Sequence, residues 1–128
     1  QRTSEQVRRL MRLVVEKGTA KSANVPGYLV GGKTGTAEKV VSGGYRKDAR
    51  ISSFVGAFPM NSPKFLVYMM LDEPKGNKST YGYATAGWVV APTIQRIVQR
   101  VAVLYGMPPQ DEAAPEVRDK MIINVAVR

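Results

Sequence analysis

The chain has 128 residues, of which 44% are hydrophobic, and it carries a formal net charge of +9. This length suits one domain or a large part of one, and the hydrophobic fraction argues against intrinsic disorder. The sequence contains no cysteine and no histidine, which excludes thiol catalysis, disulfides, zinc fingers and Ser-His-Asp triads within it. Any catalysis must therefore use hydroxyl groups, lysines, carboxylates and backbone amides.

The positive charge is concentrated in the first part of the chain. Residues 1–50 hold eleven Lys or Arg and four acids, a net charge of +7, and the remaining residues contribute +2. Such a segment can attract nucleic acid, anionic lipid or an anionic polymer, but it is also typical of a solvated basic face. Aromatic residues do not alternate with the basic ones as base stacking requires, so we do not expect nucleic acid as a partner.

The first predicted element is an amphipathic helix over residues 4–17. Thr3 and Gln6 have the spacing of a capping box, and Gly18 provides a stop. Apolar residues recur along one face at Val7, Leu10, Met11, Val14 and Val15. We expect four basic residues mostly on the solvent side, namely Arg8, Arg9, Arg12 and Lys17. The small and polar residues 19–27 predict a loop.

Three strands are predicted next. Residues 28–41 combine β-branched residues with glycines and lack a helical period, and residues 42–50 predict a polar turn. The apolar runs 51–58 and 65–71 are separated by six turn-forming residues, which predicts an antiparallel hairpin. Because both runs are dense in apolar residues, we expect protein on both faces of this sheet.

The last part of the chain predicts a loop, a helix and a tail. Residues 72–83 are polar and contain proline and glycine, whereas helical spacing returns over residues 85–105, with Pro92 at a start or a kink. Residues 109–128 predict an extended or disordered tail, in which the apolar residues 121–127 could pair as a strand.

These elements predict an α+β fold, in which the first and last helices pack on one face of a three-stranded antiparallel sheet. A sheet this small leaves strand edges with unpaired backbone groups. We therefore expect the chain on its own to self-associate through the edge of the strand at residues 65–71. No apolar run reaches membrane-spanning length and no leader precedes the first helix, so we expect any membrane anchor to lie outside this chain.

The residues with the clearest chemistry are Lys33, Thr34, Gly35 and Thr36 on the first predicted strand. Side chains alternate along a strand, so Thr34 and Thr36 share one face, and Gly35 permits close backbone packing on the other. Two hydroxyls and an ammonium group in this pattern suit a carboxylate ligand. A backbone N–H on an exposed strand edge can also stabilise an oxyanion.

The longer string over residues 31–37 (Gly-Gly-Lys-Thr-Gly-Thr-Ala) resembles the third signature of the penicillin-recognising serine enzymes, whose set is Ser-x-x-Lys, Ser-x-Asn and Lys-Thr-Gly. Segments further along look like those of class B penicillin-binding proteins, in the order and spacing of the septal, cell-division branch: residues 51–59, 71–74, 81–88 and 91–92. The resemblance covers residues 3–108. It implies that residues 1–108 are the C-terminal part of a transpeptidase domain.

The resemblance implies a peptidoglycan D,D-transpeptidase that cross-links stem peptides and is acylated by penicillins and other β-lactams. It also implies cell-division proteins as partners, a place on the periplasmic face of the bacterial inner membrane, and neither cofactor nor metal. Carried onto this chain, Lys33 and the Thr36 N–H would have catalytic roles, while Thr34, Gly35 and Thr36 would bind substrate. Tyr81 and Gly82 would lie at the rim of the cleft.

The chain departs from the family pattern in one important respect: it contains no Ser-x-x-Lys. We therefore expect the nucleophilic serine to lie outside this chain and the chain alone to be inactive. Ser22-Ala23-Asn24 imitates the second signature but lies only eleven residues before Lys33, so we interpret it as a coincidence in a loop. Trp88 is interpreted as a core residue beside Phe54 and Phe58.

Two alternatives stay open at this stage. The basic first half is compatible with an interaction module for nucleic acid or an anionic surface. Within the same superfamily, a penicillin-sensor domain or a β-lactamase is a further possibility, which the segments after residue 50 disfavour.

Overall fold

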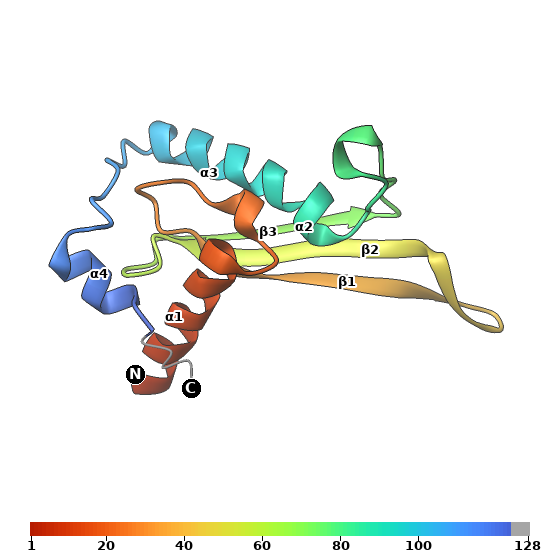
Figure 1. The fold of residues 1–128 in the computed structure, drawn as a ribbon, viewed down its shortest axis with the longest axis horizontal. Helices are drawn as coiled ribbons and strands as arrows, with labels where there is room; N and C mark the ends of the chain where they lie inside the picture. Colours follow the sequence, from red (N-terminus) through yellow and green to blue (C-terminus); the bar gives the residue numbers. More distant parts are fainter. Residues whose placement is uncertain (124–128) are drawn as a thin grey trace.

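The computed structural model describes residues 1–123 and shows an α+β fold, as predicted (Figure 1). One sheet has the antiparallel strand order β1-β2-β3. The elements in chain order are α1 (Arg2–Lys17), η1 (Lys21–Ala23), β1 (Gly31–Val41), β2 (Gly44–Phe58), β3 (Phe65–Asp72), η2 (Lys78–Thr80), α2 (Ala86–Val89), α3 (Ala91–Leu104) and α4 (Pro115–Met121). No helix within the described residues is both long and apolar enough to cross a membrane.

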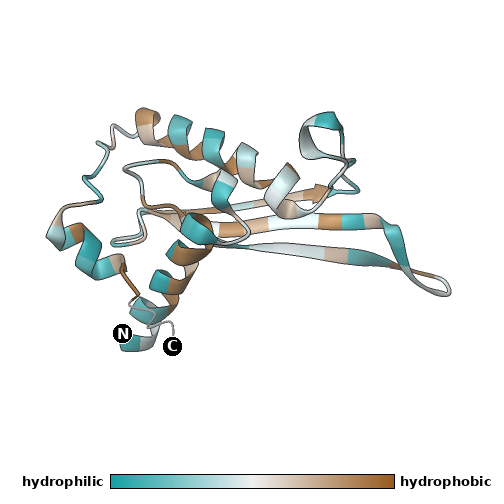
Figure 2. Ribbon diagram, viewed as in Figure 1, coloured by the Kyte–Doolittle hydropathy of each residue, from teal (hydrophilic) through white to brown (hydrophobic). Residues whose placement is uncertain are grey.

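The helices α1 and α3 pack on the same face of the sheet, which confirms that prediction. Val15 of α1, Ile94 and Val98 of α3, and Phe54 and Phe58 of β2 are all fully buried in one cluster. Figure 2 shows apolar stretches on these helices and on β2 alternating with polar ones, as expected for elements with one buried side.

The opposite face of the sheet is exposed over β3 and the middle of β2 among the described residues, contrary to our expectation. Leu66, Tyr68 and Met70 of β3 are 75%, 60% and 51% exposed, and Val55 of β2 is 40% exposed. These residues alternate with Phe65, Val67, Met69 and Leu71, which pack against the core. The dense apolar run of β3 therefore reflects two apolar faces, of which only one is covered by residues 1–123.

The predicted turn over residues 42–50 is wrong, because most of these residues belong to β2. Val41 pairs with Gly44, so the turn is tight, and Gly43 and Gly44 occupy φ values of +102° and +130°. The paired residues 38–50 form a hairpin arm that projects beyond the helices (Figure 1). A solvated two-stranded arm needs no apolar face, so its polar sequence is indistinguishable from that of a loop.

Helix α1 differs from its prediction at its start and in one buried residue. It begins at Arg2, with Gln1 as an N-cap that makes no side-chain hydrogen bond, so the capping box predicted at Thr3 is not formed. Arg12 is only 1% exposed, which corrects its predicted solvent position. Its side chain points toward the segment that enters β1, where Asn24 and the Val30 carbonyl accept its hydrogen bonds.

The extended tail predicted from residue 109 is wrong over Pro115–Met121, which form α4. Pro115 in the first turn and Glu116 beside it are helix-start signals that outweigh the acidic composition of this segment. Val117 is buried in a second cluster with Leu29 and Met60. Met121 ends α4 instead of starting a strand, and residues 124–127 of the suggested strand lie outside the described residues.

Ile94 tests whether the shared core holds the helices to the sheet. We expect Ile94→Ala to lower the free energy of unfolding by about 2–5 kcal/mol, because it leaves a cavity under α3. Val103→Ala is the matched control, since Val103 is 79% exposed on the same helix and its truncation should change stability by less than about 0.5 kcal/mol. Urea denaturation of both variants measures the difference, and equal losses would contradict the packing described.

Self-association of the chain on its own remains a prediction, and β3 allows a direct test. Sedimentation velocity should show larger species as concentration rises, because the outer edge of β3 has no partner strand within residues 1–123. Tyr68→Lys should reduce association by placing charge beside that edge. Leu104→Lys, at an exposed apolar position on α3, should not. A compact monomer at high concentration of the unmodified chain would argue against this edge as an interface.

Candidate functional site

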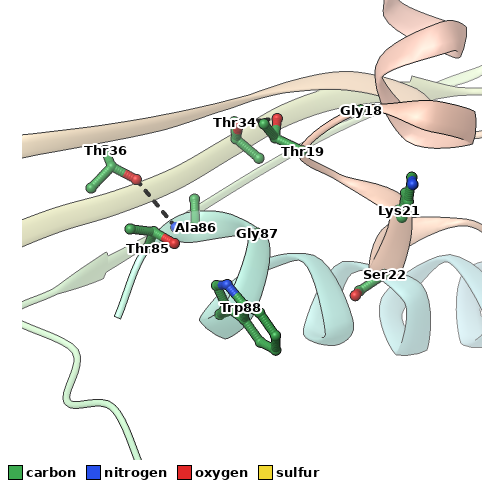
Figure 3. Close-up of a pocket in the computed structure, with 10 residues that line it drawn as sticks. All are labelled: Gly18, Thr19, Lys21, Ser22, Thr34, Thr36, Thr85, Ala86, Gly87 and Trp88. Carbon is green, nitrogen blue, oxygen red and sulfur yellow. Dashed lines mark hydrogen bonds between the residues drawn. The ribbon is translucent and has the colours of Figure 1, made fainter. Parts of the chain in front are cut away.

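A pocket of about 490 Å³ lies between β1, the segment that follows α1, and the start of α2 (Figure 3). Its lining comes from parts of the chain that are far apart in sequence: Gly18, Thr19, Lys21, Ser22, Thr34, Thr36, Thr85, Ala86, Gly87 and Trp88. Five of these ten residues carry hydroxyl groups, so the pocket offers several hydrogen-bonding groups to a polar ligand.

Thr34 and Thr36 both line this pocket, and their hydroxyls are held by neighbouring segments (Figure 3). The Thr34 and Thr19 hydroxyl oxygens lie 2.8 Å apart in a hydrogen bond, and the backbone N–H of Ala86 donates to the Thr36 hydroxyl over 3.2 Å. The alternation of side chains along β1 thus places two hydroxyls on one side of the pocket.

Lys33 and Gly35 are on β1 but do not line the pocket. Lys33 pairs with Val55, and its ammonium donates a 2.8 Å hydrogen bond to the Thr34 carbonyl. A side chain at position 35 would come within 2.9 Å of the Ser53 hydroxyl, which itself donates to the Gly35 carbonyl over 3.3 Å. Gly35 therefore has a packing role between β1 and β2, and Lys33 supplies positive charge next to the pocket rather than inside it.

Tyr81 and Gly82 follow η2 in a turn that Asn77 caps. The Asn77 side chain accepts from the N–H groups of Ser79 and Thr80, and Tyr81 and Gly82 then take φ values of +51° and +79°. Neither residue lines the pocket. The Tyr81 ring meets the Trp88 ring edge-on with centroids 5.7 Å apart, so this turn reaches the pocket only through Trp88.

Trp88 lies at the pocket and not in the core, which corrects our interpretation of it. It is 42% exposed, and its ring stacks on Tyr83 with centroids 5.5 Å apart. The short helix α2 directs it away from the buried Phe54 and Phe58. Aromatic residues at 81, 83 and 88 are a signal that these side chains could form a cluster of their own.

Several pocket residues carried no usable signal in the sequence. Thr19, Lys21 and Ser22 fall in a segment that predicted only a loop, and Gly87 lies in a predicted helix. A side chain at position 87 would collide with the Thr19 carbonyl, so glycine is required for α2 to approach this segment. Ser22 lines the pocket, whereas Asn24 turns away to accept from Arg12, so these two residues do not act together.

A charge cluster joins β1 to the end of β3 outside the pocket. The Lys39 ammonium lies 2.7 Å from Asp72 and 3.0 Å from Glu73, and the hydrogen bonds that it donates to these carboxylates, first to Asp72, raise the Lys39 pKa above its usual 10.5. Both acids, although adjacent in sequence, are directed to one ammonium group. Among residues 1–123, no group of three acids could hold a metal ion.

With this geometry established, comparison with known families is informative. A family model described as penicillin binding protein transpeptidase domain matches residues 1–95. The chain belongs to this transpeptidase family. The predicted resemblance to penicillin-binding transpeptidases is thereby confirmed.

Relatives and solved structures agree with this family. The chain is 40% identical over 119 residues to the probable peptidoglycan D,D-transpeptidase FtsI of Caulobacter vibrioides, and 40% identical over 108 residues to stage V sporulation protein D of Bacillus subtilis. These matches cover 86% and 84% of the chain but only 20% and 16% of the relatives. The chain therefore spans about a fifth of their length or less.

Two solved structures of penicillin-binding protein 3 share the fold. The transpeptidase domain from Burkholderia pseudomallei is 39% identical with a TM-score of 0.71, over 84% of this chain and 31% of that one. The Mycobacterium tuberculosis protein, solved in complex with ampicillin, is 28% identical with a TM-score of 0.73, over 88% of this chain and 26% of that one.

The position of Trp88 can be tested by fluorescence, because it is the only tryptophan in the chain. We expect the acrylamide quenching constant of the folded chain to be a substantial fraction of that of the urea-unfolded chain, because Trp88 is 42% exposed. Emission that resists quenching until the chain unfolds would show instead that Trp88 is buried in the core.

Proposed function

We propose that the longer protein carrying this chain is a serine-type D,D-transpeptidase that cross-links peptidoglycan stem peptides during cell division. The observation that carries the proposal is the pair of hydroxyls of Thr34 and Thr36 on one side of a 490 Å³ pocket, on a strand at the edge of the sheet. The names of the two transpeptidase relatives, FtsI and penicillin-binding protein 3, support the same reaction class.

The residues of β1 have distinct roles in this proposal. The hydroxyls of Thr34 and Thr36 bind the terminal carboxylate of a stem peptide, or that of a β-lactam which imitates it. The Thr36 backbone N–H donates to the oxyanion that forms on the attacked carbonyl, and one such donor is typically worth about 2.7–4 kcal/mol in the transition state. Lys33 adds positive charge that favours both anions, and Gly35 keeps the strand close to β2.

The rim and the nucleophile come from other segments. Tyr81 and Gly82 contact substrate at the rim, where the Tyr81 ring packs edge-on against Trp88. The nucleophilic serine and its lysine belong to the part of the protein outside this chain, because no Ser-x-x-Lys occurs in these residues. The chain alone is therefore inactive. The longer protein acts at the periplasmic face of the inner membrane, where cell-division proteins are its partners.

A basic interaction module is the weaker alternative. Several cations of the basic half are already engaged: Arg12 with Glu16 and Glu112, Lys39 with Asp72 and Glu73, and Arg46 with Asp48. Duplex DNA binding that is weak and insensitive to salt would remove this alternative, because phosphate neutralisation produces a steep salt dependence.

Covalent labelling by a fluorescent penicillin tests the main proposal. The full-length protein should be labelled, and Thr34→Val and Thr36→Val should each lower the second-order acylation rate by roughly tenfold or more, because each removes a hydrogen bond to a carboxylate. Thr3→Val, on the exposed first turn of α1, should label as the wild type does. The chain alone should remain unlabelled. Labelling of the chain alone, or none of the full-length protein, would overturn the proposal.

A further inference from the structure

Residues 110–121, which we call the C-terminal strap, run back along α1 and the segment that enters β1 (Figure 1). At its start, the Gln110 N–H donates to the Gly27 carbonyl over 2.8 Å, and the Asn61 amide donates to the Gln110 side chain over 2.7 Å. At its end, the Arg9 guanidinium donates to the Lys120 carbonyl over 2.9 Å. The strap is therefore attached at both ends and is not a loose tail.

Below the strap, the Arg12 side chain is 2% exposed and contacts four residues, one of them on its own helix. One terminal nitrogen, Nη1, donates to the Val30 carbonyl and to the Asn24 side chain, each over 2.8 Å. The other, Nη2, donates to Glu112 of the strap over 3.0 Å. The remaining nitrogen, Nε, lies 3.0 Å from a carboxylate oxygen of Glu16 and forms an ion pair with it. The geometry of this contact is not that of a hydrogen bond.

Glu112 joins this buried guanidinium to the backbone that precedes β1. One of its carboxylate oxygens accepts from Arg12, and the other accepts from the Gly27 N–H over 2.7 Å. A buried guanidinium is costly unless a carboxylate compensates its charge, and a second hydrogen bond on that carboxylate fixes its direction. Glu112 therefore orients Arg12 as well as neutralising it.

The two acceptors of Arg12 Nη1 lead to opposite sides of the pocket. Val30 directly precedes Gly31, the first residue of β1, and a side chain at position 31 would lie within 3.0 Å of the Arg12 backbone nitrogen. Asn24 is the residue that caps η1, whose Ser22 lines the pocket. The Asn24 carbonyl also accepts from Gln95 of α3 over 2.9 Å. One buried cation thus connects both sides of the pocket.

We propose that Arg12 and Glu112 are positioning residues, through which the strap sets the spacing between β1 and η1 and so the placement of the Thr34 and Thr36 hydroxyls. This inference rests on the proposed function, because it assigns the spacing a role in acylation. Thr34 lies only four positions after Val30 along an extended chain, so a shift at the start of β1 is passed to the hydroxyls. Displacements of about 1 Å at a reacting group can cost on the order of 100-fold in rate.

The test uses the full-length protein and the substitution Glu112→Gln, which keeps the shape of the side chain and removes its charge. We expect the acylation rate with a fluorescent penicillin to fall about tenfold, and hydrogen exchange in a peptide covering residues 31–37 to become faster. Glu116→Gln is the matched control, because Glu116 is an exposed acid of the same strap, and it should stay within about twofold of the wild type in both measurements.

A double-mutant cycle separates positioning from general loss of stability. Arg12→Met should lower acylation at least as much as Glu112→Gln, and the double variant should be no slower than Arg12→Met alone, because both act through one contact. All rates are measured well below the melting temperature of each variant, so that only folded protein reports. If Arg12→Met does not fold, Glu112→Gln and its control decide the matter alone.

Two outcomes overturn the inference. One is that the wild type is labelled and Glu112→Gln is labelled at the same rate. Even if the melting temperature of Glu112→Gln were lower, the strap would then only stabilise the fold. The other is unchanged exchange over residues 31–37 in Glu112→Gln. Absence of labelling in the wild type would instead contradict the proposed function, and the exchange measurement would still report on the strap.

Discussion

The start of β1 lies so close to its neighbours that no side chain fits there, and the rest of the site depends on this close packing. A Cβ atom at position 31 would meet Met60 and the backbone of α1, one at position 32 would meet Phe54 and the Val55 carbonyl, and one at position 56 would meet the Gly31 carbonyl. Three glycines therefore let β1 approach both β2 and α1. This contact fixes where Thr34 and Thr36 emerge a few residues later.

The pocket is formed where this strand meets two other segments. Thr19 reaches the Thr34 hydroxyl from the end of α1, and the backbone of α2 reaches the Thr36 hydroxyl from the far side of the core. Gly87 allows α2 to come this close, because a side chain at this position would collide with the Thr19 carbonyl. The site thus combines hydroxyls of a strand with backbone groups of a helix start, an arrangement in which donors are held in place before any anion arrives.

Much of the fold could be predicted because its patterns are local. The apolar residues of α1 and α3 recur at helical spacing, and the short apolar runs of β2 and β3 are joined by a turn-forming segment that predicts a hairpin. The hairpin arm and α4 were missed because their polar composition is shared by loops, and only pairing at Gly44 or burial of Val117 distinguishes them. Arg12 was misplaced because a charge usually faces solvent, and its burial depends on carbonyl and carboxylate acceptors from distant segments.

By itself, the sequence determined the fold class, the family and the strand that carries Lys33, Thr34 and Thr36, since these follow from residue types and short spacings. Only the tertiary structure decided that Lys33 and Gly35 lie beside the pocket, that Trp88 lines it and that Glu112 of the strap reaches Arg12. The physical reason is that contacts between residues separated by up to a hundred positions depend on how helices and strands pack, and no local pattern encodes that packing.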